Sequence, residues 1–159
     1  MTSTTRPAVL LRELCGADEP RMGRLFFRLS PETIYRRFMT HYSDPQPLRP
    51  LLDVDGDRRL AVVAVDDTGE IIGVARYAKL ADDSSAADIA VLVEDAAQRH
   101  GVGSALLAEL TDKARAAGVR RFTGTMLAGN DACANLLRKA FPDVVLQTSH
   151  GETTLHVTL

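Results

Sequence analysis

The sequence has no tryptophan and only two cysteines, Cys15 and Cys133, among its 159 residues. The absence of indole rings excludes a tryptophan platform for ligand binding. The two cysteines form neither a Cys-x-x-Cys pair nor a Cys/His spacing typical of zinc, so we expect no metal site. Isolated cysteines of this kind are typical of reduced thiols, and we expect both to be mostly buried.

Long apolar runs and a strong excess of one charge are also missing. No stretch is long enough to span a bilayer, and residues 1–7 lack the hydrophobic segment of a signal peptide. A formal net charge of −2 gives no reason to expect nucleic acid or an anionic membrane as a partner. We therefore expect a cytoplasmic protein, a monomer or homodimer, built as one domain over residues 1–159.

The spacing of apolar residues predicts seven strands and four helices. The expected strands are 9–11, 60–65, 71–78, 87–93, 121–127, 144–148 and 153–159. The expected helices run from an Asp18 cap through Leu29, from a Ser30 cap through Phe38, from Ser104 to Ala117, and from an Asn130 cap to Phe141. Ile34, Tyr35 and Phe38 are expected to face inward. The pattern indicates an α/β fold of the mixed α+β kind, with a mixed, mostly antiparallel sheet flanked by the helices.

Two glycines, Gly101 and Gly103, separate the strand at 87–93 from the helix that begins near Ser104. A helix N-terminus presents unpaired N–H groups and a partial positive charge, and glycines let an anion approach the backbone closely. Arg99 and His100 in the same loop can face a phosphate. A tight strand-to-helix turn explains the glycines as well, and neither a Walker A loop nor the dinucleotide fingerprint is present.

The residues around this loop carry a more specific pattern. The apolar strand ending at Val93, the spacing Gln98-x-x-Gly101-x-Gly103 and the leucine-rich helix resemble motif A of the GNAT superfamily, the Gcn5-related N-acetyltransferases. The segment 130–141 resembles motif B, an Asn-capped helix ending in a Gly-Phe pair, although alanine replaces the glycine here. The resemblance covers nearly the whole chain and implies a single GNAT domain that uses acetyl-CoA as co-substrate.

The motif A loop of GNAT proteins holds the pyrophosphate of acetyl-CoA. By that resemblance the coenzyme contacts the following residues: Leu92, Val93, Gln98, Arg99, His100, Gly101, Val102, Gly103, Ser104 and Asn130. Asn130 has a second, compatible interpretation as the cap of its own helix.

A narrower resemblance concerns the segments 29–38, 51–55 and 87–93, which look like the GNAT domain of bacterial protein lysine acetyltransferases of the Pat type. Those enzymes acetylate acyl-CoA synthetases among other proteins, so a protein lysine is the acceptor that the resemblance implies. Many of them carry a large regulatory domain. This sequence shows none, so we expect such control to be absent or supplied by another protein.

Acetyl transfer needs a base, because a free lysine amine with a pKa of about 10.4 is mostly charged at neutral pH. Asp88 is the candidate, because it interrupts an apolar strand, and partial burial there would raise its pKa. The Pat-like enzymes carry glutamate at this position, so the shorter aspartate implies proton transfer through a water. A strand-end carboxylate bonded to a loop is the alternative. Glu94 and Asp95 are rivals for the base, but their position favours a solvated or loop-bracing role.

The remaining catalytic groups follow from the family resemblance. A backbone N–H at Leu92 or Val93 would stabilise the oxyanion. Many GNAT enzymes protonate the leaving thiolate with a tyrosine, but this chain has Leu137 there, so water or departure as thiolate is expected. Cys133 permits an acyl-cysteine route, although its spacing favours packing.

The helix after Ser30 borders the acceptor site in GNAT folds, and it carries Arg36 and Arg37. Paired arginines are more often a solvated face, which is how we interpret them. Three functions remain open: a protein lysine acetyltransferase, an acetyltransferase of a small amine, and a non-catalytic acyl-CoA-binding module.

Overall fold

The computed structural model describes residues 9–159, which build one seven-stranded sheet in the order β1-β2-β3-β4-β5-β7-β6. The strands are β1 (Leu10–Glu13), β2 (Arg59–Val65), β3 (Ile71–Lys79), β4 (Ala86–Val93), β5 (Arg121–Leu127), β6 (Val145–Ser149) and β7 (Glu152–Thr158). All neighbours are antiparallel except β4 and β5. The mixed, mostly antiparallel sheet predicted from the sequence is confirmed.

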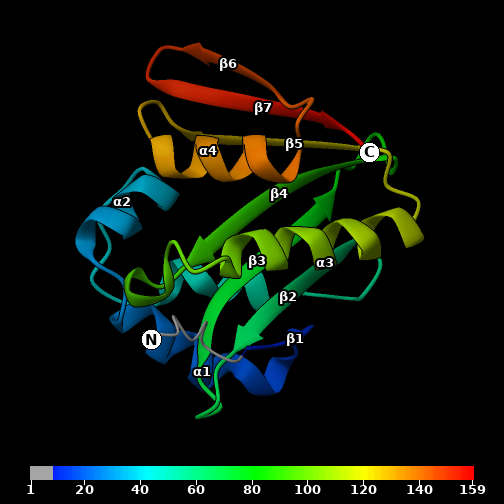
Figure 1. Cartoon of the computed structure of the whole chain (residues 1–159). Helices are drawn as coiled ribbons and strands as arrows, with labels where there is room; N and C mark the ends of the chain where they lie inside the picture. Colours follow the sequence, from blue (N-terminus) through cyan, green and yellow to red (C-terminus); the bar gives the residue numbers. More distant parts are fainter. Residues whose placement is uncertain (1–8) are drawn as a thin grey trace, which may run out of the picture.

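Helices cover both faces of this sheet (Figure 1). The α-helices of the described residues are α1 (Glu19–Phe27), α2 (Pro31–Phe38), α3 (Val102–Ala116) and α4 (Asp131–Ala140). Helix α3 packs against β2, β3 and β4, and its leucines share one core with the alternate residues of those strands. The opposite face of the sheet packs against α1 and α2 in a second core. None of these helices combines the length and the apolarity that a membrane span requires.

The sheet opens between β4 and β5, the two strands that form its parallel pair. Strands β4 and β5 are paired only between residues 86–88 and 121–123. Beyond Asp88, β4 continues to Val93 along β3, and β5 continues to Leu127 along β7, without further pairing between the two. The strands therefore diverge toward their C-terminal ends. The backbone edges of β4 and β5 are left facing one another across a gap in the sheet.

Two of the four helix starts follow the residues that the sequence singled out. Helix α3 begins at Val102, two residues before the expected Ser104, because Gly101 is its N-cap residue. Ser30 caps α2 by accepting the N–H of Thr33 at 3.1 Å, and Asn130 caps α4 by accepting the N–H of Cys133 at 3.2 Å. Asp18 stands before α1 but does not cap it. Its buried carboxylate instead accepts two hydrogen bonds from Arg12, at 2.7 and 2.8 Å. The expectation that Asp18 caps this helix is therefore wrong, because a buried charge takes the stronger ionic partner.

Other expectations about single side chains are also corrected. Cys15 is exposed rather than buried, because it lies in the loop between β1 and α1. Tyr35 is 37% exposed and stacks on the ring of His41 instead of facing the core. The proline-rich segment after α2 contains a short 3-10 helix, Gln46–Leu52, which buries Leu48 and Leu51.

Candidate functional site

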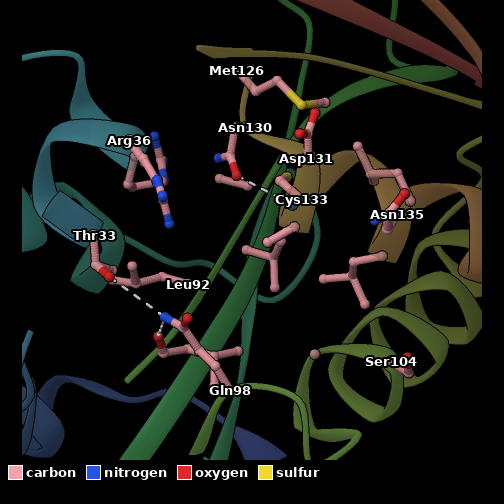
Figure 2. Close-up of a pocket in the computed structure, with 18 of the residues that line it drawn as sticks. Thr33, Arg36, Leu92, Gln98, Ser104, Met126, Asn130, Asp131, Cys133 and Asn135 are labelled. Atoms are coloured by element: carbon pink, nitrogen blue, oxygen red, sulfur yellow. Dashed lines mark hydrogen bonds between the residues drawn. The ribbon is translucent and has the colours of Figure 1, made fainter. Parts of the chain in front are cut away.

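A pocket of about 670 Å³ occupies the gap between β4 and β5 (Figure 2). Its walls come from the C-terminal half of β4, the loop after it, the first residues of α3, helix α4 and the facing part of β5. Helix α2 contributes a further wall across from α4. Chain segments far apart in sequence thus meet where the sheet fails to close.

The N-terminus of α3 opens into this pocket. Gly101 is its N-cap residue, with a φ of 82° that favours glycine, and no side chain caps the helix. The N–H of Ala105 is the first to bond within the helix, to the carbonyl of Gly101 at 3.1 Å. The N–H groups of the preceding residues have no intrahelical acceptor, and the helix dipole adds positive potential there. The arrangement suits an anion such as a diphosphate.

The structure brings most of the predicted coenzyme residues together. Those that line the pocket are Leu92, Val93, Gln98, Arg99, Gly101, Gly103, Ser104 and Asn130. The other two do not line it. Val102 is 2% exposed because its side chain packs into the core, and His100 is exposed to solvent. Any contact from Val102 would therefore come from its backbone.

Gly103 has a role that its spacing did not reveal. A Cβ on Gly103 would lie 2.9 Å from Cδ2 of Leu136 on α4, which is closer than real Cβ contacts. The missing side chain therefore lets α3 and α4 approach each other directly beside the pocket. Gly101, by contrast, has open space around it and is needed for its backbone conformation.

The hydrogen-bond ladder of β4 decides which backbone groups face the pocket. The N–H of Glu94 bonds to the carbonyl of Ile72 on β3 at 2.9 Å. In an antiparallel pair, bonded and non-bonded positions alternate, so Leu92 also bonds toward β3, while Val91 and Val93 point toward β5. The carbonyl of Val93 does accept the side-chain N–H of Gln98 within the pocket, at 3.0 Å. Of the two residues that the sequence offered for an oxyanion donor, the ladder favours Val93 over Leu92.

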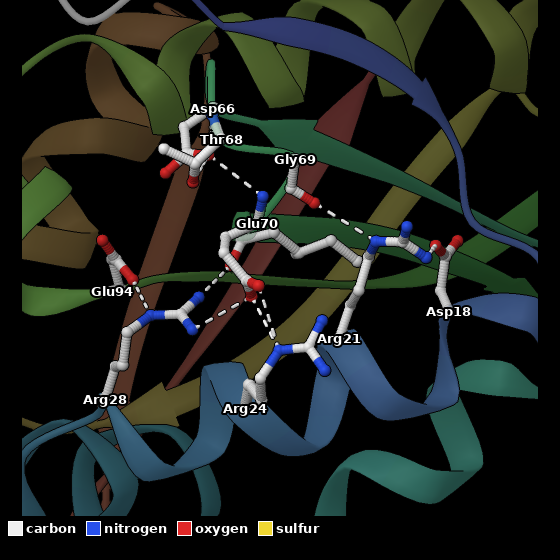
Figure 3. A network of polar contacts seen from close by, with 10 residues as sticks. Asp18, Arg21, Arg24, Arg28, Asp66, Thr68, Gly69, Glu70 and Glu94 are labelled. Carbon is white, nitrogen blue, oxygen red and sulfur yellow. Dashed lines mark hydrogen bonds and ion pairs between the residues drawn. The ribbon is translucent and has the colours of Figure 1, made fainter.

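The two acidic residues after β4 fasten the loop to neighbouring helices. Glu94 pairs with the guanidinium of Arg28, which also binds Glu70 and the carbonyl of Ile71 (Figure 3). This contact belongs to a network between α1 and the β2–β3 turn. The side chain of Glu94 is 13% exposed and bonds to Arg28 rather than lining the pocket. A bracing role for Glu94 agrees with this geometry.

Asp95 makes the corresponding contact with α2. Its carboxylate accepts the N–H of Ser30 at 3.0 Å and the hydroxyl of Thr33 at 3.1 Å. Desolvation raises the pKa of Asp95, but these hydrogen bonds outweigh it and leave the pKa lowered. The side-chain N–H of Gln98 also approaches the Thr33 hydroxyl, at 3.5 Å. The loop and α2 are therefore joined at the pocket edge.

Asp88 lies on the face of β4 that α2 covers in part, together with Ala90 and Leu92. Its side chain is exposed and does not line the pocket wall. The surrounding protein still desolvates the carboxylate enough to raise its pKa, while Arg76 and Arg37 act in the opposite direction. The residue lies at the last paired position before β4 and β5 separate.

Helix α4 presents Cys133 to the pocket, next to its cap Asn130. Burial raises the pKa of the Cys133 thiol, opposed by Arg37, so the thiol form is favoured at neutral pH. Leu137 is 1% exposed and packs in the core. The helix therefore offers no side-chain acid at that position.

The arginines of α2 were misjudged from the sequence. Arg36 and Arg37 are partly buried and line the pocket. Among residues 9–159, Arg36 forms an ion pair with Glu32 one turn earlier, and Arg37 forms none. Their spacing gave no signal, because a helical arginine pair looks the same whether solvent or a cleft lies beside it. Thr33, a third α2 residue at the pocket, also gave no signal.

Within residues 9–159, no three His, Cys, Asp or Glu side chains cluster as metal ligands.

Comparison with known proteins agrees with this arrangement. The acetyltransferase (GNAT) family model matches residues 27–141. Acetyltransferase PA5475 of Pseudomonas aeruginosa is 33% identical over 133 residues, which cover 80% of this chain and 71% of that protein. Acetyltransferase Pat of Mycolicibacterium smegmatis is 34% identical over 132 residues. That match covers 80% of this chain but only 39% of the longer relative.

Two solved structures share the fold. The GNAT domain of S. lividans PAT has a TM-score of 0.85 at 24% identity, covering 100% of both chains. A phosphinothricin acetyltransferase from Sinorhizobium meliloti, solved in complex with acetyl-CoA, has a TM-score of 0.74 at 20% identity. It covers 95% of this chain and 88% of that chain. Because the family model spans more than half of the sequence and one relative is 33% identical over most of it, this chain belongs to the GNAT family of N-acetyltransferases.

Proposed function

We propose that this protein transfers an acetyl group from acetyl-CoA to the side-chain amine of a protein lysine, for example on an acyl-CoA synthetase. The observation that carries the coenzyme half of this proposal is the uncapped N-terminus of α3 at a pocket between diverging strands. The choice of a lysine acceptor is supported by the similarity to the Pat protein of M. smegmatis and to the S. lividans PAT domain. On this proposal residues 1–159 act as one acyltransferase domain.

The diphosphate of the coenzyme would bind the N–H groups at 101–104, with Arg99 beside it. The pantetheine arm would then run between β4 and β5 and bond to the free backbone edge of Val93, as an extra strand would. Asn130 of α4 borders the same channel. On this path the thioester would lie near the point where the two strands separate.

Asp88 would accept the proton of the acceptor ammonium through a bridging water, and its raised pKa makes it a better base than an ordinary aspartate. The neutral amine then attacks the thioester carbonyl directly. The developing oxyanion would receive a hydrogen bond from the N–H of Val93, or of Val91 one pair earlier. The C–S bond breaks and the CoA thiolate leaves. The second proton of the attacking nitrogen passes through water to this thiolate, so the products are the neutral amide and CoA.

The test is a turnover assay in which CoA release from acetyl-CoA is followed with a folded acyl-CoA synthetase, with lysine peptides and with small amines. Acetylation of protein lysine, located by mass spectrometry, is the expected result. Turnover with small amines alone would replace the proposed acceptor with a small molecule. Acetyl-CoA binding without CoA release on any acceptor would instead indicate a non-catalytic acyl-CoA-binding module.

A further inference from the structure

Two guanidinium groups beside the proposed acceptor position form no direct ion pair with an acidic side chain of residues 9–159. No ion pair or hydrogen bond among residues 9–159 involves the side chain of Arg37 or Arg76, although the neighbouring Arg36 pairs with Glu32. Both side chains are partly buried. Arginines at such positions ordinarily engage a carboxylate, because removing a charge from water is costly unless it is paired.

The strand register places these groups around Asp88. Arg76 on β3 lies opposite Ala90, and Asp88 lies opposite Ala78, so Arg76 and Asp88 are diagonal neighbours on one face of the sheet. Arg37 comes from α2 and, like Ala90, lines the pocket, and its charge interacts with those of Arg76 and Asp88. Helix, β3 and β4 thus direct two cations and one carboxylate to the same place.

The charges of this cluster do not balance. Burial lowers the pKa of Arg37, and Arg76 lowers it further, while Asp88 acts in the opposite direction. Asp88 feels both arginines in return. One carboxylate therefore faces two guanidinium groups, and the cluster retains one net positive charge. A second anion would lower the electrostatic energy of the site.

We infer that the acceptor amine carries an anionic group of its own, a carboxylate, which binds Arg37 and Arg76 while the amine faces Asp88. This inference rests on the proposed function and specifies its acceptor. The carboxylate is an acidic side chain next to the target lysine, or the carboxylate of a free amino acid. Guanidinium groups bind carboxylates through charge-assisted and often bidentate hydrogen bonds. The same two cations repel polyamines, which carry further positive charges.

The experiment compares acceptors that differ only in charge. Lysine peptides with glutamate, glutamine or lysine beside the target residue are assayed with acetyl-CoA, together with an amino acid and the amine formed by its decarboxylation. The glutamate peptide is expected to have a KM about tenfold to hundredfold below that of the glutamine peptide, the range of one charge-assisted hydrogen bond. The comparison of the amino acid with its decarboxylated amine shows whether the site recognises a free carboxylate, as opposed to an acidic side chain on a peptide.

Variants assign the preference to the two arginines. Arg37→Gln and Arg76→Gln should raise the KM of the glutamate peptide by a similar factor and leave the KM for acetyl-CoA unchanged. Arg76→Glu should shift the preference toward the lysine-flanked peptide. Arg115→Gln removes an exposed positive charge from α3 and is the matched control. Thermal melts establish that each variant is folded.

Equal KM values for the three peptides, and equal values for the amino acid and its decarboxylated amine, would overturn the inference while leaving the acetyltransferase proposal intact. A rise in the KM for acetyl-CoA in the arginine variants would also overturn it, because the arginines would then hold the coenzyme. If no acceptor turns over, the proposed function fails instead. Calorimetric binding of the same peptides to the CoA-loaded protein then still decides whether an anion is preferred.

Discussion

The carboxylate of Asp95 accepts the hydroxyl hydrogen of Thr33 at 3.1 Å, which joins the loop after β4 to the first turn of α2. The same carboxylate accepts the N–H of Ser30 at 3.0 Å. The loop carries the proposed diphosphate site, and α2 carries Arg37, one of the two arginines of the proposed acceptor site. This contact is therefore a physical link between the two binding regions.

Asp95→Asn should weaken both functions of the site. An amide has one acceptor oxygen and no charge, so it cannot hold Ser30 and Thr33 as the carboxylate does. We expect a severalfold rise in the Kd for acetyl-CoA and in the acceptor KM together, measured by calorimetry and steady-state kinetics. Asp112→Asn, on an exposed position of α3, is the control. A change in only one of the two constants would contradict the proposed link.

Asp88→Asn should remove turnover but not coenzyme binding. Loss of a general base typically lowers the rate by about 10²- to 10⁴-fold. Because the pKa of Asp88 is raised in the folded protein, its ionisation opposes folding, and stability tied to it falls as pH rises through that pKa. The free energy of unfolding at pH 7 should therefore not decrease in Asp88→Asn. A fully active variant at neutral pH would exclude Asp88 as the base.

The free energy of unfolding should depend on pH in the acid range through Asp18. Its hydrogen bonds from Arg12, together with the N–H of Cys15, lower its pKa from 3.8 to about 2. Because the folded pKa is depressed, the stabilisation is complete above the unfolded pKa and disappears as pH falls from about 4 toward 2. At 1.36 kcal/mol per unit, Asp18→Asn should cost about 2 kcal/mol at neutral pH. Denaturant melts should give different free energies of unfolding for the two proteins at pH 7 and similar values near pH 2.

Gly103→Ala tests the close contact of α3 and α4. The new methyl would press on Leu136, so the leucine must change rotamer or α4 must shift. We expect a loss of about 1–3 kcal/mol in unfolding free energy and weaker acetyl-CoA binding. Gly23→Ala, with open space in α1, should instead stabilise by about 1 kcal/mol. The double variant Gly103→Ala, Leu136→Ala should recover coenzyme binding, and failure to do so would point to a direct role for the glycine.

The two cysteines should react differently with a thiol alkylating reagent. Cys15 is exposed, whereas Cys133 lines the pocket and has a raised pKa. Cys15 should be modified first, and acetyl-CoA should slow the modification of Cys133 only. Mass spectrometry of the two peptides over time measures both rates. Equal protection of both cysteines would contradict the position proposed for the coenzyme.

Most of the element order could be predicted from the sequence, because it depends on local signals. Ser30 and Asn130 cap the helices that they precede, and Gly118 follows α3 with a φ of 88°. Continuous apolar runs, and alternation in the last two strands, located the seven strands to within a few residues. The spacing from Gln98 to Gly103 identified the loop, because the backbone chemistry of a helix N-terminus is encoded by adjacent residues.

The tertiary structure decided what depends on partners distant in sequence. It made Asp18 an ion-pair partner of Arg12, turned Arg37 toward a cleft, and brought Leu136 against Gly103. It also directed the N–H of Val93 rather than Leu92 toward the gap. The pairing of β4 with β3 decides this, because alternate residues of β4 bond to β3 and the others point away from it. The sequence by itself therefore determined the elements and the loop. Only packing between elements fixed which side chains and which backbone groups face the pocket.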